Sequence, residues 1–144
     1  MKKNVLICLD RDGTMIYDDG NYHLGRQRNW KSLIKFLPGV ISGIKRLKKI
    51  DNVKIYMLTN QPGVARSDFP LLTFDKSLEV CVEILNQLER KGAGINGYEI
   101  CPHMSPVDAR KYKGVKFKKG LMCNCKCIKP KIGMVRDALD EEGW

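Results

Sequence analysis

Asn-Val-Leu-Ile-Cys-Leu-Asp-Arg-Asp-Gly-Thr, residues 4–14, is the stretch of sequence that decides the fold. It begins with a nearly continuous apolar run, which is typical of a strand buried on both faces of a parallel sheet. Two carboxylates, Asp10 and Asp12, follow directly after this run. Because open α/β sheets bind their ligands at the carboxyl ends of the strands, the stretch predicts an α/β fold with a polar site at these two residues.

The segments after this stretch alternate between helix and strand patterns. Residues 38–50 carry apolar side chains on one side and lysines on the other, which predicts an amphipathic helix. Residues 53–58 are mostly apolar and predict a second strand, and residues 97–101 are expected to form a short third strand. The most regular helical pattern covers residues 74–91, and a last helix is expected over residues 132–139. The apolar stripe of the longest helix is expected to consist of Phe74, Leu78, Cys81, Leu85 and Leu88.

These elements predict one domain over residues 1–144. A strand, a helix and a second strand of these lengths form a unit with parallel strands and a right-handed crossover. We therefore predict a Rossmann-like three-layer α/β sandwich with a parallel sheet. Residues 14–37 are polar and contain several glycines, so we expect mostly loop there and no large cap domain over the site.

The composition favours an anionic partner. The chain has 26 Lys and Arg against 16 Asp and Glu, a formal net charge of +10. Such an excess attracts phosphate esters, nucleic acid or acidic surfaces, and a solvated basic surface has the same composition. The basic stretch 110–119 has the same two explanations. No apolar run is long enough to span a bilayer and no signal-peptide core is found, so we expect a cytoplasmic protein without membrane contact, monomeric by default.

Four polar residues predict phosphoryl-transfer chemistry. Asp10 can act as a nucleophile, and Asp12 is close enough to exchange a proton with a leaving group or water. Thr59 ends the second strand, so its hydroxyl is expected at the same sheet edge. Lys129 supplies a cation that offsets charge on a phosphoryl group. Each residue alone has a simpler explanation as a turn residue, a strand end or a surface charge, but together they are specific.

The two strand-end stretches resemble those of a known family. Residues 9–14 are similar to motif I of haloacid dehalogenase-like (HAD) phosphatases. Residues 59–66, Thr-Asn-Gln-Pro-Gly-Val-Ala-Arg, are similar to motif II of one subgroup. That subgroup contains D-glycero-D-manno-heptose-1,7-bisphosphate 7-phosphatase and histidinol-phosphate phosphatase. The resemblance covers residues 5–139 and implies hydrolysis of a small phosphorylated substrate, such as heptose bisphosphate or histidinol phosphate.

The resemblance also implies a role for each site residue. Asp10 would form an aspartyl-phosphate, and Asp12 would act as general acid and base. Thr59 would hydrogen-bond the phosphoryl group, and Lys129 would be the motif III lysine. Mg²⁺ would lie between the Asp10 carboxylate and the Asp12 backbone carbonyl. Two further residues would lie near the substrate, Asn60 and Arg66.

A second set of residues has the composition of a metal site. Cys101 and His103 form one closely spaced pair, and Cys125 and Cys127 form another. Four nitrogen and sulfur ligands favour a structural, tetrahedral Zn²⁺; a group of free thiols is the alternative, and Cys123 with Cys125 has the same spacing. In the subgroup that the chain resembles, Cys-x-Cys is followed by Arg-Lys-Pro, which matches the pair Cys125 and Cys127. The resemblance thus implies a zinc-binding loop at about residues 101–127, with Cys123 as a spare thiol.

Two departures from the family pattern affect the expected function. Ile128 stands where the subgroup has an arginine that contacts the distal part of the substrate. No motif IV acidic residue, in a Gly-Asp pair after another strand, follows Lys129. The third magnesium-binding carboxylate and the strand before it are therefore missing. We expect the 144 residues to be a fragment, or a natural truncation, of a domain longer by about 30–50 residues.

Two other functions fit parts of the sequence. Related HAD enzymes that share motif I are polynucleotide 3′-phosphatases, and a net charge of +10 suits DNA. A catalytically impaired zinc-binding module would explain the missing motif IV. The intact set Asp10, Asp12, Thr59 and Lys129 favours an enzyme instead.

Overall fold

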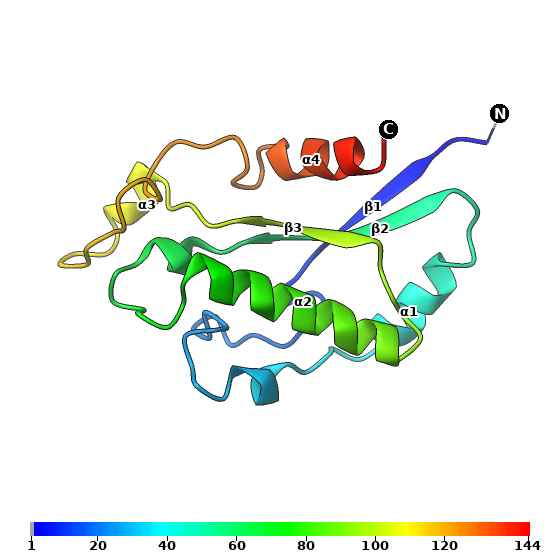
Figure 1. Cartoon of the computed structure of the whole chain (residues 1–144), viewed down its shortest axis with the longest axis horizontal. Helices are drawn as coiled ribbons and strands as arrows, with labels where there is room; N and C mark the ends of the chain where they lie inside the picture. The colour runs from blue at the N-terminus through cyan, green and yellow to red at the C-terminus, as the bar shows by residue number, and fades with distance from the viewer. Residues whose placement is uncertain (1) are drawn as a thin grey trace.

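The computed structural model describes residues 2–144, and its helices and strands follow the predicted order (Figure 1). The strands are β1 (Val5–Asp10), β2 (Val53–Asn60) and β3 (Gly97–Cys101). The helices are α1 (Val40–Leu47), α2 (Phe74–Arg90), α3 (Pro106–Ala109) and α4 (Gly133–Glu141). Within residues 2–144 no helix combines the length and the apolar character that crossing a membrane requires.

The three strands form one parallel sheet in the order β1-β2-β3. Successive residues of the central strand face opposite sides of the sheet. Ile55 and Met57 pack in the cluster that contains residues of α1 and α2, whereas Tyr56 and Leu58 pack with α4. Two helices therefore cover one face and α4 covers the other, as Figure 1 shows. The predicted three-layer α/β fold is confirmed.

Strand β1 corrects one expectation, because it is not buried on both faces. Val5 is 43% exposed, and Cys8 is exposed as well. Among the described residues β1 pairs with β2 alone, so its other edge and part of its α4-facing side have no protein cover. The continuous apolar run predicted the strand correctly, and the open edge agrees with the expectation that a neighbouring strand is missing.

Helix α2 begins at a residue that satisfies its free amide groups. The Thr73 hydroxyl accepts a hydrogen bond from the Lys76 N–H at 3.1 Å, which is an N-cap. The predicted stripe is rotated relative to the observed one: Cys81 and Leu88 are buried, but Phe74 is 42% exposed. The residues that face the sheet are Ser77, Val80, Cys81, Ile84 and Leu88. The apolar periodicity did not identify Ser77, because this residue is buried but polar.

The segment between β1 and α1, predicted to be mostly loop, is irregular but supplies part of the core. It contains one short 3₁₀ helix, Trp30–Leu33. Met15 and Ile16 are both 1% exposed and pack in the same cluster as Ile55 and Ile84. The segment therefore closes the α1/α2 face of the sheet next to Asp12 rather than extending over the site as a cap.

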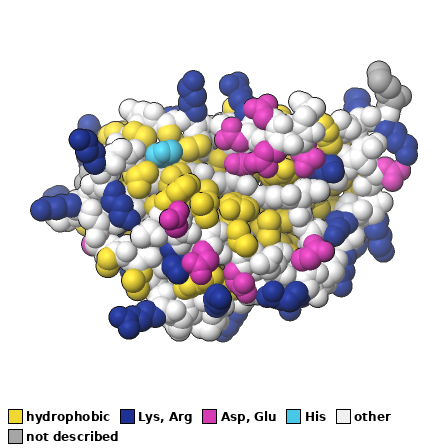
Figure 2. Space-filling model, in the orientation of Figure 1, with side chains coloured by type: hydrophobic (Ala, Val, Ile, Leu, Met, Phe, Trp, Pro, Cys, Tyr) yellow, Lys and Arg dark blue, Asp and Glu magenta, His cyan; other side chains and the backbone are white. Residues whose placement is uncertain are grey.

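The surface in Figure 2 shows how the charges are distributed around β3. Apolar side chains form a band between α2 and α4, acidic side chains gather over α4, and most lysines and arginines project from the rim. The band contains a cavity of about 480 Å³ whose apolar lining includes Phe74, Leu78 and Ile100.

Candidate active site and Cys/His cluster

The residues predicted for phosphoryl transfer meet at the carboxyl ends of β1 and β2. Asp10 ends β1, and Thr59 lies one residue before the end of β2. Lys129 comes from the loop before α4 and donates from Nζ to Asp10 Oδ1 and, at 3.0 Å, to the Leu58 carbonyl. The side chains of Asp10 and Lys129 are 46% and 32% exposed, so this ion pair is accessible from solvent.

Asn60 fixes the main chain of Lys129. Its Oδ1 accepts from the Lys129 N–H at 3.0 Å, and its Nδ2 donates to the Lys129 carbonyl at 3.4 Å. The predicted role of Asn60 was substrate contact. It does line a cavity beside Lys129, but its hydrogen bonds are made to the chain and hold the lysine against β2.

Asp12 is held by two buried side chains that the sequence did not single out. Arg11 donates from Nε to Oδ1 at 2.8 Å and from Nη2 to Oδ2 at 3.1 Å, a bidentate ion pair. Gln61 donates from Nε2 to Asp12 Oδ2 at 2.8 Å and to Thr59 Oγ1 at 2.7 Å. An arginine and a glutamine in loop-like stretches are expected at the surface, so pattern reasoning gave no signal for either.

Arg11 is fully buried, and its charge depends on Asp12. Its Nη1 also lies 3.7 Å from Cys81 Sγ on α2. Burial disfavours the charged form, but the Asp12 carboxylate and the Cys81 sulfur outweigh this effect, so the pKa of Arg11 is raised. The ion pair thus joins the site to the core of the α2 face.

The turn after Asp12 satisfies the Arg11 carbonyl but not the Asp12 carbonyl. Gly13 has φ +79°, a conformation that suits glycine. The Arg11 carbonyl accepts from the N–H groups of Met15 and Ile16 at 3.0 and 3.1 Å, whereas the Asp12 carbonyl accepts no hydrogen bond among the described residues. A carboxylate and an unsatisfied carbonyl are the oxygen ligands that Mg²⁺ prefers, so this donor set fits the predicted ion.

Arg66 is occupied by contacts within the protein. It pairs with Asp68 at 2.7 Å, and its guanidinium lies over the rings of Phe69 and Tyr112 at 4.2 and 4.7 Å. The hydrogen bond to Asp68 raises the pKa of Arg66. The basic stretch 110–119 reaches this region, since Lys118 donates its N–H to the Ala65 carbonyl at 2.7 Å. Part of that stretch is therefore packed against motif II.

The predicted zinc ligands converge at the end of β3. Ligand atoms of Cys101, His103, Cys125 and Cys127 all lie within 4.8 Å of one another, and we call this group the Cys/His cluster. Cys101 Sγ lies 2.7 Å from Cys127 Sγ and 3.4 Å from His103 Nδ1. Cys123 is not part of the group. Three sulfur atoms and one imidazole nitrogen gathered within this distance are the kind of ligand set that binds a structural Zn²⁺.

The Cys/His cluster is partly shielded from water. Cys101 is buried, and burial together with the neighbouring Cys127 raises the pKa of its thiol. Without a metal the raised pKa favours the protonated thiol. A bound metal favours the thiolate instead, because the thiolate is the form that coordinates metals. The cluster lies next to the candidate active site in the chain, since Lys129 follows Cys127 by two residues.

The acidic residues near the C-terminus serve a different part of the fold. Tyr56 donates its hydroxyl to Glu142 at 2.9 Å and lies 3.2 Å from Glu141, and Lys54 pairs with Glu142 at 3.6 Å. These contacts are with the first half of β2, whereas Asp10 lies beside the end of that strand. The two glutamates therefore do not supply the carboxylate that motif IV would provide.

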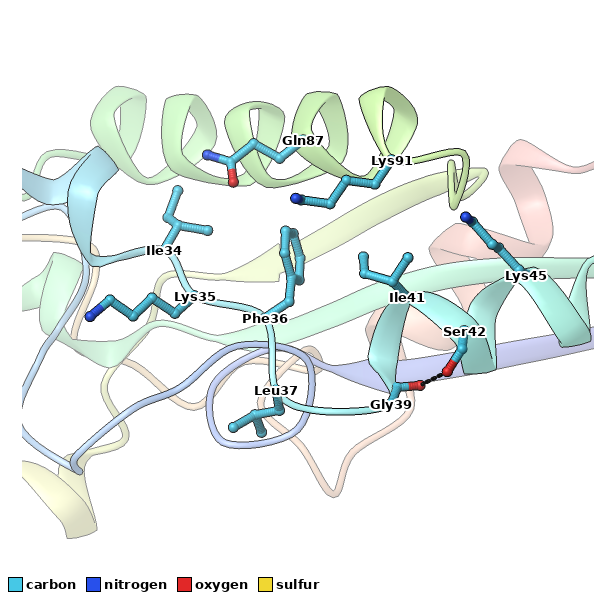
Figure 3. Close-up of a pocket in the computed structure, with 10 residues that line it drawn as sticks. All are labelled: Ile34, Lys35, Phe36, Leu37, Gly39, Ile41, Ser42, Lys45, Gln87 and Lys91. Carbon is cyan, nitrogen blue, oxygen red and sulfur yellow. Dashed lines mark hydrogen bonds between the residues drawn. The ribbon is translucent and has the colours of Figure 1, made fainter.

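Two cavities differ in their relation to the site. A cavity of about 200 Å³ lies between Lys129 and α3, and its lining includes Asn60, Ser105 and Ile128. Figure 3 shows another, of about 620 Å³, between the first turn of α1 and the end of α2. It is lined by Phe36 and three lysines and contains none of the predicted site residues. The smaller cavity adjoins the candidate active site through Lys129, and a third cavity, of about 420 Å³, is lined by both Asp10 and Lys129.

The chain, a parallel three-layer α/β fold with this set of residues at the carboxyl edge of its sheet, is similar in sequence to proteins named as phosphatases. A protein named D-glycero-beta-D-manno-heptose-1,7-bisphosphate 7-phosphatase from Haemophilus influenzae is 34% identical over 138 residues, 96% of this chain and 64% of that protein. The Pasteurella multocida protein of the same name is 32% identical over 98% of this chain. The Histidine biosynthesis bifunctional protein HisB of Buchnera aphidicola is 30% identical over 96% of this chain and 33% of its own length.

The comparisons confirm the resemblance that the motifs predicted, since the similar proteins are named heptose-1,7-bisphosphate 7-phosphatases and the histidine biosynthesis bifunctional protein HisB. The chain spans slightly under two thirds of the length of the heptose phosphatases it matches. A solved D,D-heptose 1.7-bisphosphate phosphatase from B. bronchiseptica, complexed with magnesium and phosphate, has the same fold, with a TM-score of 0.67 over 97% of this chain and 24% identity. No family model matches the sequence.

Proposed function

We propose that this chain carries the reacting residues of a magnesium-dependent phosphomonoester hydrolase. The observation that supports this most strongly is the contact of Lys129 with Asp10, residues 119 positions apart. A lysine that pairs with an exposed carboxylate beside a strand-end threonine is the arrangement that phosphoryl transfer needs. The similarity to heptose-1,7-bisphosphate 7-phosphatases over 96% of the chain supports the same conclusion.

The reaction proceeds in two displacements. Asp10 attacks phosphorus, the bond from phosphorus to the ester oxygen breaks, and Asp12 gives that oxygen a proton. Water then attacks the aspartyl-phosphate, Asp12 takes its proton, and inorganic phosphate leaves with Asp10 regenerated. Thr59 donates a hydrogen bond to a phosphoryl oxygen, and the Lys129 ammonium offsets its negative charge.

Two metal ions have separate roles in this proposal. Asp10 and the Asp12 carbonyl would hold Mg²⁺, which supplies positive charge to the phosphoryl oxygens when bound. The Cys/His cluster would hold Zn²⁺ as a structural ion that orders the loop 101–127. Lys129 follows that loop directly, so ordering it also helps to place the lysine.

The substrate is a small phosphorylated metabolite, a heptose bisphosphate or histidinol phosphate. The cavity of about 200 Å³ beside Lys129 has the size of one small leaving group. Its lining contains Ser105, Asp108 and Lys111, which suit a group rich in hydroxyls or carrying an amine. Ile128 also lines it, in place of the arginine that would contact a second phosphate, and this favours histidinol phosphate.

A phosphate-release assay tests the proposal. The 144-residue chain is incubated with Mg²⁺ and heptose bisphosphate, histidinol phosphate or a 3′-phosphorylated oligonucleotide. We expect slow magnesium-dependent release that Asp10→Asn abolishes and that the control Asp51→Asn, at an exposed position, leaves unchanged. Release that survives Asp10→Asn would refute the aspartyl-phosphate route.

The same assay separates the alternatives. A preference for the oligonucleotide with steep salt dependence would favour a polynucleotide 3′-phosphatase. No turnover by the chain would favour the impaired zinc-binding module. Full magnesium-dependent turnover by the 144-residue chain would refute the expectation that a further motif IV carboxylate is required.

A further inference from the structure

Gln61 is a buried residue whose side-chain donors are both used on the proposed reacting groups. It follows β2 directly and is 4% exposed. One amide nitrogen donates to Asp12 Oδ2 at 2.8 Å and to Thr59 Oγ1 at 2.7 Å. The orientation of the amide is fixed chemically, because an ionised carboxylate can only accept and therefore faces the nitrogen rather than the oxygen.

The main chain of Gln61 is also held in place. Its N–H donates to the Cys101 carbonyl at 2.7 Å, and its own carbonyl accepts from the Val64 N–H at 3.2 Å. Cys101 is the last residue of β3, so the Gln61 backbone is anchored to the sheet. Because both the backbone and the amide are fixed, Gln61 has little freedom to follow the movements of its partners.

The hydrogen bond from Gln61 leaves the hydroxyl hydrogen of Thr59 available for another acceptor. Thr59 Oγ1 accepts the amide hydrogen of Gln61, so its own hydroxyl hydrogen is free for another acceptor. Thr59 is 1% exposed and lies beside Asp10 and Lys129, where a phosphoryl group would bind. The same amide therefore orients two groups, a proton-transfer carboxylate and a phosphate-binding hydroxyl.

We propose that Gln61 is a positioning residue that aligns Asp12 with Thr59 before the substrate binds. The inference rests on the proposed function. Arg11 holds Asp12 from the adjacent residue, whereas Gln61 is the described side chain that ties Asp12 to β2. A misplacement of about 1 Å can lower a rate by about 10²-fold, so loss of this tie lowers kcat while phosphate binding through Lys129 persists.

Steady-state kinetics with Mg²⁺ and the best phosphomonoester substrate test this role. Gln61→Met keeps the volume of the side chain but removes the donors, and Gln61→Glu keeps its shape but repels Asp12. We expect kcat to fall about 10- to 100-fold in both, with KM changed by less than about twofold. The matched control is Gln87→Met, since Gln87 also donates to a carboxylate, Glu83, at 3.1 Å. An unchanged kcat, or a loss confined to KM, would overturn the proposal.

A double-mutant cycle provides a readout that does not depend on turnover. Asp12→Ala, Gln61→Met and the combined variant are unfolded in urea. Effects on the unfolding equilibrium constant that are non-additive by about fivefold or more support the contact. Additivity within about twofold overturns it. Coupling in a chain without any magnesium-dependent turnover would overturn the proposed function, and the catalytic role of Gln61 with it.

Discussion

Replacing Arg11 by Met tests how far the ion pair with Asp12 stabilises the fold. The substitution keeps a long, flexible side chain in a site with no exposure and removes three polar contacts. It also leaves the Asp12 carboxylate without its cation, although the hydrogen bond from Gln61 remains.

The expected loss can be worked from these contacts. Breaking a fully buried ion pair by removing one partner costs about 3–5 kcal/mol. The Asp12 side chain is 30% exposed, so the abandoned carboxylate stays partly hydrated. Burying a Met side chain also avoids the cost of removing water from a guanidinium group, and this offsets a further part of the loss of about 3–5 kcal/mol. We expect a net loss of about 2–3 kcal/mol in the free energy of unfolding.

Urea unfolding measures this loss. Trp30 is 5% exposed and reports on the core by fluorescence. With a slope of about 2 kcal/mol per molar urea, the midpoint should fall by about 1–1.5 M. The control Arg46→Met, at an exposed position on α1, should shift the midpoint by less than about 0.3 M. Equal shifts in the two variants would refute the reasoning.

Three further predictions concern the metal, the pH dependence and the core. Adding Zn²⁺ at about 100 times its dissociation constant should stabilise the chain by about 2.7 kcal/mol, and Cys127→Ser should remove this effect; calorimetry with and without chelator measures it. Burial and the neighbouring Glu141 raise the pKa of Glu99 to about 8 from 4.5. The folded state thus keeps a proton that the unfolded state loses, so stability falls as pH rises between these values. Glu99→Gln should flatten this fall in urea midpoints between pH 5 and 9; an unchanged slope would contradict it. Ile84→Ala, at a site with no exposure, should lower the free energy of unfolding by about 2–5 kcal/mol. A smaller decrease, measured by urea unfolding, would mean that neighbouring side chains fill the cavity.

The sequence was sufficient for the sheet and for the contacts that its motifs carry. Strand β3 has the predicted bounds, and β2 extends only two residues beyond them. Short apolar runs followed by polar motif residues identify parallel strands well, because burial on both faces leaves little choice of residue. The convergence of Asp10 with Lys129 could be predicted from motif order, although no local pattern connects residues so far apart.

The features that were missed depend on tertiary surroundings. The exposure of Val5 and Cys8 on β1 depends on which elements cover the strand, which an apolar run does not encode. The burial of Arg11 depends on a carboxylate and a sulfur brought to it by separate elements. Helix α3, only four residues long, is not among the helices predicted from the sequence. A helix of one turn is too short to produce an apolar repeat.

The two hydrogen bonds between Asn60 and the main chain of Lys129 have a consequence for how the chain can vary. An amide side chain that both donates and accepts reproduces the pairing of a neighbouring strand, so Lys129 is attached to the sheet without belonging to it. Neither bond involves the lysine side chain or the residues before it. The segment between the two halves of the Cys/His cluster can therefore gain or lose residues over evolutionary time while Lys129 keeps its position beside Asp10.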